Sequence, residues 1–382
     1  MAAPVMEAVE ALESHLHPTP SFTIEDHPYP KGQEEIWRFS PLRALKPLLT
    51  DEPSDAHLQW DESLPAGSSR RTVSTDEARA LAAEAPIDRV SVLAAARSGG
   101  AQLVEIAPGA ELTDPVSITL TGTGQHVWGH LVFKVGAHAK GTILLRHEGS
   151  ASYATKVDVL VGDGAKINFV SIQDWADDAV HGGHHSVLVG RDAEVRTVTV
   201  SLGGKVVRLA ETARFAGPGG SLEQFGLYFV DAGQHIEHRL FVDHNAPHTH
   251  SNVDYRGALQ GEGARSVWIG DVLIRKVAEG ISTYESNKNL VLTDGCRADS
   301  VPNLEIETGE IEGAGHSSTT GRFDDEQLFY LRSRGIPEAE ARRLVVRGFF
   351  ADIVRRIGVP EVEEHMMAAV ERELSVTMGA YA

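Results

Sequence analysis

The middle of the chain, from about residue 101 to residue 310, alternates apolar and polar positions in short runs. Runs such as TKVDVLV, INFVSIQ, VRTVTVSL and HIEHRLFV are rich in Val, Ile and Thr. A period of two is typical of β-strands, and no helical periodicity interrupts this stretch. The pattern therefore predicts a region built almost entirely of strands.

The strands are separated by a turn, often containing glycine, in which a small residue recurs at intervals of 29, 26, 28, 27 and 26 positions. These small residues are Ala110, Ala139, Ala165, Ala193, Gly220 and Ala246. A steady period favours a stacked-repeat architecture over a sandwich or barrel, which needs no such recurrence. The six-residue period of left-handed β-helices is absent, so we predict a parallel β-helix of larger coils with an apolar interior.

The two flanks of this region read as helical caps for a solenoid whose ends must be covered. Residues 1–100 mix helical stretches with loops, Ser74 to Glu77 form a capping box, and 50–70 reads as an exposed loop. After 321, Asp324 is a candidate N-cap, and a last helix is expected over 361–374. One apolar stripe is expected on a helix between them, formed by Val346, Phe350, Ile353, Val354 and Ile357. The predicted domains are 1–100, 101–321 and 322–382.

Charge and composition narrow the class of protein. The chain has 35 Lys and Arg against 54 Asp and Glu, a net charge of −19, which disfavours nucleic acid and anionic membrane as partners. The N-terminal stretch does not read as a signal peptide, and no run of about 18 apolar residues predicts a membrane span. The single cysteine indicates a reducing compartment, most simply the cytoplasm.

The chain carries no P-loop, CxxC, HExxH or GxSxG motif, and its glycines have no dinucleotide-binding context. The 18 histidines gather in two groups, which could bind a first-row metal. Their spacing matches no zinc signature, so solvent-facing or turn histidines are the favoured interpretation. The groups are His181, His184 and His185, and His235, His238, His244, His248 and His250.

Two isolated residues near the end of the strand region are candidates for metal chemistry. Cys296 is either a small buried apolar residue or a thiolate ligand or sulfur acceptor, and the residues alone leave both interpretations open. His316 follows twenty positions later in GAGHSSTTG, just before the helical pattern. By itself it is either a ligand or a turn histidine.

The run from 287 to 350, NKNLVLTDGC through VVRGFF, resembles the C-terminal signature of the SufB/SufD family of iron–sulfur cluster assembly scaffolds. EEIWRFSPL at 34–42 resembles the N-terminal motif of the same family. The resemblance covers nearly the whole chain and implies a right-handed parallel β-helix between helical caps. With its shorter N-terminal part and single cysteine, the chain resembles the SufD branch, as in actinobacteria, more than the SufB branch.

The resemblance also implies partners and site residues. It implies a SufB paralogue and the SufC ATPase as partners, with His316 at the interface where a nascent cluster is held. Ala314 stands where some SufD proteins have a cysteine, and Cys296 matches an important cysteine of SufB. The region matching the SufC-docking helices contains Phe329, Tyr330, Arg332, Arg334, Gly335, Phe349 and Phe350, and packing within the cap is the alternative for the aromatic residues.

We therefore expect a non-enzymatic scaffold that shares a transient iron–sulfur cluster with SufB and leaves ATP hydrolysis to SufC. No cofactor is expected on this chain alone, while a flavin bound by the whole complex stays open. Two alternatives are a β-helix enzyme acting on polysaccharide, which is usually secreted, and a scaffold that works only as a homodimer.

Overall fold

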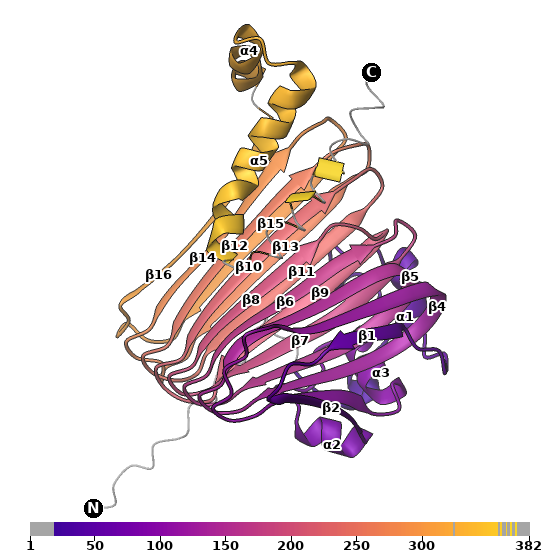
Figure 1. The fold of residues 1–382 in the computed structure, drawn as a ribbon, viewed down its shortest axis with the longest axis vertical. Helices are drawn as coiled ribbons and strands as arrows, with labels where there is room; N and C mark the ends of the chain where they lie inside the picture. Colours follow the sequence, from indigo (N-terminus) through magenta and orange to yellow (C-terminus); the bar gives the residue numbers. More distant parts are fainter. Residues whose placement is uncertain are drawn as a thin grey trace, which may run out of the picture.

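The chain folds into a parallel β-solenoid, in a computed structural model that describes residues 19–323 and 325–357 and, beyond these, 360, 364, 367–368 and 371–372. From β6 onward, successive strands lie alternately in two layers, and each pairs in parallel with strands two places away in the sequence (Figure 1). The predicted β-helix is confirmed.

The strands of the two layers have regular lengths. One layer holds β7 (Val180–Val189), β9 (Val206–Phe215), β11 (His235–His244), β13 (Arg265–Ile274) and β15 (Arg297–Ile306). The other holds β6 (Lys166–Trp175), β8 (Glu194–Ser201), β10 (Ser221–Val230), β12 (His250–Leu259), β14 (Ser282–Val291) and β16 (Gly313–Arg322). The solenoid starts with β3 (Ala101–Ile106), β4 (Val116–Val135) and β5 (Lys140–Val161), and β5 pairs with β6 through its first half and with β7 through its second.

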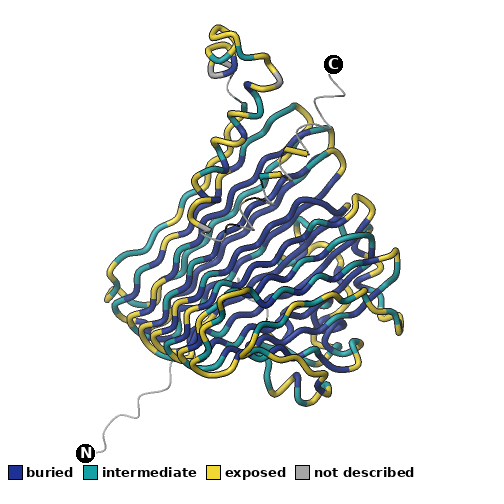
Figure 2. The backbone as a smooth tube through the Cα atoms, in the orientation of Figure 1, coloured by how far each residue is buried: buried dark blue, intermediate teal, exposed yellow. Residues whose placement is uncertain are grey.

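Alternate side chains of each strand enter the space between the layers. In β9, Val207 and Leu209 belong to the central apolar cluster, whereas Arg208 between them contacts the N-terminal region outside the layer. The same alternation in neighbouring strands makes the interior rows continuous from coil to coil. Figure 2 shows buried residues along the strands and exposed residues at the turns.

One turn repeats in register along the solenoid and accounts for the sequence period. At each repeat one residue has a positive φ, and its N–H donates to a carbonyl of the next coil. These residues are His138, Gly164, Asp192, Gly219, His248 and Gly280. The residue that follows each of these leads into the next strand. At Ala139, Ala165, Ala193 and Gly220 it is the recurring small residue of the sequence pattern, but before β12 it is Thr249 and not Ala246.

Short helices cover the outer face of the layer that contains β5, β7 and β9. They are η1 (Ile24–Asp26), η2 (Glu35–Trp37), α1 (Leu42–Leu49) and α3 (Arg89–Arg97), while α2 (Thr75–Ala80) packs against β3. The fully buried Arg208 anchors them by pairing with Asp88 and stacking over Trp37 at 4.0 Å. As predicted, Ser74 caps a helix, because its hydroxyl accepts from the Glu77 N–H at 3.2 Å.

The prediction of a loop over 50–70 is wrong for its second half. β1 (Gln59–Ser63) pairs antiparallel with β4, and β2 (Ser68–Val73) pairs antiparallel with β3. Hydrogen bonding to an existing sheet edge outweighs the weak local pattern. Both strands belong to residues 1–100 and yet pair with strands of the solenoid. The division into domains 1–100, 101–321 and 322–382 stays a prediction.

Two helices with described bounds follow β16. α4 (Asp325–Ser333) contacts α5 (Glu338–Ile357), and α5 lies on the outer face of the β8, β10 and β12 layer. Val346, Phe350, Ile353 and Val354 are buried there, which confirms these members of the apolar stripe. The side chain of Ile357, the N-cap at Asp324 and most of the helix expected over 361–374 lie outside the described residues. In the described part of the chain, no helix is long and apolar enough to cross a membrane.

Candidate functional site

The C-terminal end of the solenoid presents two strand edges. β15 ends one layer and β16 ends the other, and the described residues place no further strand beside either (Figure 1). Such edges carry backbone N–H and C=O groups that a further strand can pair with. β16, with the sequence GAGHSSTTGR, is largely exposed and polar. Within the part of the chain that the structure describes, both of these edges are therefore unpaired.

His316 lies in the middle of β16, in the row of side chains that faces the interior. Its register partner on β14 is Glu285, while Ala314 and Ser318 flank it in the same row. The His316 side chain is 42% exposed, because no further coil covers it among the described residues. The structure thus places the predicted histidine at the C-terminal end of the solenoid interior, in a strand and not in a turn.

Glu285 was not anticipated as a site residue. Its Oε1 lies 3.9 Å from the Nδ1 of His316, and its side chain is only 2% exposed. Burial, reinforced by the nearby Asp271 carboxylate, raises the pKa of Glu285 to about 8. The recurring interval of 26–29 residues in the sequence would not have located it, because Glu285 lies 31 positions before its register partner His316.

Cys296 lies in the turn between β14 and β15 and is half-buried against the central apolar cluster. Its Sγ contacts the Gly261 carbonyl oxygen at 3.3 Å and the Thr293 hydroxyl at 3.5 Å. Burial raises the pKa of this thiol, which makes the reactive thiolate scarce. The turn follows the end of β14, six residues or roughly 20 Å of strand from the level of His316. The two candidates are not brought together within this chain.

The C-terminal helices separate the predicted docking residues into two groups. Phe350 is fully buried between α5 and the sheet, so the packing alternative holds for it, and Phe349 is partly buried beside it. Phe329 and Tyr330 are instead 74% and 56% exposed on α4. Figure 1 shows α4 projecting beyond the strands.

The basic residues and the glycine of the docking set lie near the same exposed aromatic pair. Arg334 stacks over the Tyr330 ring at 5.0 Å and donates to its hydroxyl at 3.0 Å. Arg332 pairs with Glu338 at 3.2 Å across the turn between the helices. Gly335 has a φ of 85° at the end of α4, a conformation that favours glycine. This helical hairpin is therefore a defined, exposed surface.

Comparison with known proteins decides the family. Residues 118–349 match the family model described as SUF system FeS cluster assembly, SufBD core domain. The iron-sulfur cluster assembly SufBD family protein Rv1462 of Mycobacterium tuberculosis is 50% identical over 366 residues, covering 94% of this chain and 92% of that protein. The protein of the same description ML0594 of Mycobacterium leprae is 48% identical, covering 94% and 93%. The chain belongs to the SufBD family.

A second type of SufBD family protein also matches the chain. Rv1461 of the same Mycobacterium tuberculosis strain is 26% identical over 211 residues, covering 55% of this chain and 25% of that protein. One organism thus holds two SufBD family proteins that differ in their similarity to this chain.

The two histidine groups of this SufBD family chain are mostly buried, so the favoured interpretation of solvent-facing or turn histidines is wrong for six of the eight. The buried ones are His181, His184, His185, His235, His238 and His244, while His248 and His250 are exposed. Burial lowers the pKa of His185 and of His244 to about 4, so these rings are neutral. In the described part of the chain no three His, Cys, Asp or Glu side chains are close enough to hold a metal ion together.

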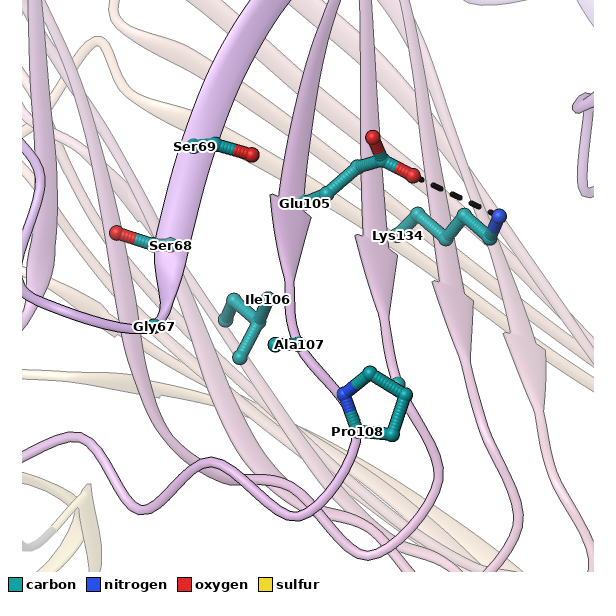
Figure 3. A pocket seen from close by; sticks show the side chains of 9 residues that line it. Gly67, Ser68, Ser69, Glu105, Ile106, Ala107, Pro108 and Lys134 are labelled. Atoms are coloured by element: carbon teal, nitrogen blue, oxygen red, sulfur yellow. Dashed lines mark ion pairs between the residues drawn. The ribbon is translucent and has the colours of Figure 1, made fainter.

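A surface groove of about 420 Å³ lies far from His316 in the solenoid, beside β2, β3 and β4. Figure 3 shows Glu105 paired with Lys134 on one side and Ser68 and Ser69 on the other. The charged residues among its lining, Glu105 and Lys134, pair at 3.6 Å, and Arg71 also pairs with Glu105 at 3.6 Å. The open end at β15 and β16 is therefore the stronger candidate for the work of a SufBD family protein.

Proposed function

We propose that this chain is the SufD-type, non-catalytic scaffold subunit of a SufBCD complex that assembles iron–sulfur clusters. It pairs with a SufB paralogue through the open edges of β15 and β16, and docks the SufC ATPase through the hairpin of α4 and α5. The observation that carries the proposal is the position of His316, exposed at the mouth of the solenoid on its last strand. Two different SufBD family proteins in one organism support a heteromeric pair.

A histidine at an open strand edge suits a shared cluster better than a self-contained one. Imidazole is a ligand for iron, but one histidine needs further thiolate or carboxylate ligands to complete the coordination of a cluster. Cys296 lies too far along the strand to supply a thiolate beside His316 in this chain. The missing thiolates would come from the SufB partner across the open edge, and the nascent cluster is then cargo of the pair.

The test replaces His316 with Ala in the complete complex reconstituted under anaerobic conditions with a sulfur source and limiting Fe²⁺. We expect cluster formation, followed by visible absorbance and acid-labile sulfide, to fall about tenfold, while size-exclusion chromatography shows an unchanged complex. Ser318→Ala is the matched control, because Ser318 is the next exposed side chain of the same row. Unchanged cluster formation in His316→Ala would remove this histidine from the function.

The docking of SufC rests on a separate surface and has its own measurement. Phe329→Ala combined with Tyr330→Ala should weaken binding of the purified ATPase, measured by calorimetry, because exposed aromatic side chains dominate such contacts. His316→Ala should leave this binding unchanged.

A purified complex containing only two copies of this chain would instead favour the homodimeric scaffold. Family membership leaves no observation in favour of the polysaccharide-active alternative.

A further inference from the structure

A buried carboxyl oxygen without a partner lies one coil below His316. Glu285 is 1% exposed, and its Oε1 has no hydrogen-bond partner. Buried polar atoms in folded proteins are almost always hydrogen-bonded, since burying a bare oxygen forfeits its hydration. The carboxyl group of Glu285 does accept a backbone hydrogen bond from Asn303, but the packing of the described residues leaves Oε1 itself without a partner.

The neighbouring interior side chains do not satisfy this oxygen, because they bond to one another. Asn289 donates to the Asn287 side-chain oxygen at 2.7 Å and to the Ser300 hydroxyl at 3.1 Å. Asn287 in turn donates to the Tyr228 hydroxyl at 2.9 Å. On the other side, a side chain at position 270 would overlap the Oε2 of Glu285, so Gly270 leaves room for the carboxyl group to lie across the interior.

The free oxygen faces the exposed histidine. Glu285 and His316 are register partners on adjacent parallel strands, and both belong to the interior row. The distance from Oε1 to Nδ1 is 3.9 Å. Two ligands that each lie about 2.1 Å from one metal ion are roughly 3 to 3.5 Å apart. A small rotation of the exposed imidazole closes this difference without moving the buried carboxyl group.

We propose that Glu285 Oε1 and His316 Nδ1 bind one Fe²⁺ ion together, as a two-ligand half-site on this chain. The inference deepens the proposed function and rests on it for the identity of the metal. Carboxylate oxygen and imidazole nitrogen are both accepted ligands of divalent iron, and metal binding displaces the proton that the buried carboxyl group otherwise holds. The remaining coordination positions face the open edge beyond β16, where a partner chain can supply them.

The first test measures Fe²⁺ binding to the untagged, isolated chain by anaerobic calorimetry. Glu285→Gln and His316→Ala should each weaken the strongest site at least about tenfold, because loss of even an indirect contact to a metal ligand typically costs that much. Ser318→Ala should bind Fe²⁺ like the unmodified chain. Thermal unfolding without metal checks that the buried Glu285→Gln variant is folded. Fe²⁺ binding by folded Glu285→Gln that equals the unmodified chain overturns the half-site.

A second measurement needs no variant. Zn²⁺ serves as a diamagnetic probe of the ¹⁵N-labelled chain, and the ring nitrogens of His316 are followed by NMR. We expect the large metal-induced shift at Nδ1, the nitrogen that faces Glu285. A shift at Nε2 alone overturns the half-site, because Nε2 is not the nitrogen beside Oε1.

The two proposals can fail separately. If Glu285→Gln leaves Fe²⁺ binding intact while His316→Ala stops cluster formation in the complex, the half-site is wrong and the scaffold function stands. If both variants lose Fe²⁺ while His316→Ala still assembles clusters, the half-site stands and the proposed role of His316 in assembly is wrong.

Discussion

Replacing Phe350 with Ala should release α5 from the solenoid while leaving the solenoid folded. Phe350 is fully buried in the apolar cluster that joins α5 to the outer face of β8, β10 and β12. Its neighbours there include Phe225 and Leu227 from the sheet and Ile353 from the same helix. The solenoid interior forms a separate cluster, so this substitution removes contacts between the helix and the sheet and within the helix, and none in the interior.

The magnitude follows from burial and from the weakness of the other contacts. A buried Phe→Ala substitution costs about 3–5 kcal/mol, the sum of lost apolar transfer and the cavity left behind. Two ion pairs also hold α5, Arg256 with the half-exposed Asp352 and the partly exposed Arg356 with Asp254, each at 2.7 Å, but pairs with an exposed partner contribute about 0–1 kcal/mol each. Loss of the phenyl ring should therefore cost more than loss of either ion pair.

Hydrogen exchange followed by mass spectrometry measures this effect segment by segment. A loss of 3–5 kcal/mol corresponds to a decrease in protection of α5 amides by roughly 200-fold to several thousandfold, unless the helix already exchanges at its intrinsic rate. Protection of β8 and β10 should change little. Phe329→Ala is the control, because that ring is 74% exposed and its removal should cost less than about 0.5 kcal/mol. Equal protection of α5 in both variants would refute the reasoning.

Two further predictions concern the interior. Burial lowers the pKa of His147 to about 3 and of His185 to about 4, so unfolded chains bind more protons than folded ones below pH 6.5. The stability that each neutral ring contributes is complete above pH 6.5 and falls by about 2 kcal/mol by pH 5. In urea denaturation, the His185→Asn chain should therefore lose less stability between pH 7 and pH 5 than the unmodified chain. Gly257→Ala would place a methyl group inside the Tyr228 ring and should destabilise the chain by about 1–3 kcal/mol or more in the same assay. Gly313→Ala, which meets no atom within 4 Å, should change stability far less, and equal losses would contradict the ring contact.

Much of the architecture could be predicted from local sequence patterns, because a solenoid repeats the same strands and turns in every coil. The alternation in β9 and β10 and the turns ending in Ala165 and Ala193 recur at the spacing that one coil requires. The stripe through Val346 and Ile353 likewise follows from the helical period alone. Short-range chemistry decides such features, so a single sequence contains them.

The wrong predictions, for the histidines and for β1, share a different cause. His185 and His238 look like surface residues in an exposed motif, yet both are buried, because each strand is covered by the strand of the opposite layer. β1 has little strand pattern of its own and forms because β4 offers an edge. In each case a segment distant in sequence changes the environment of the residue.

The candidate site divides in the same way. The sequence by itself determined that this chain stacks coils between helical regions, and the resemblance of its C-terminal stretch singled out His316. Only the tertiary structure decided that His316 stands in the interior row at an open end, 3.9 Å from Glu285, and that Cys296 lies elsewhere. The physical reason is that strand periods specify which face a residue takes, whereas the register between coils, which selects its neighbours, depends on the length of every turn between them.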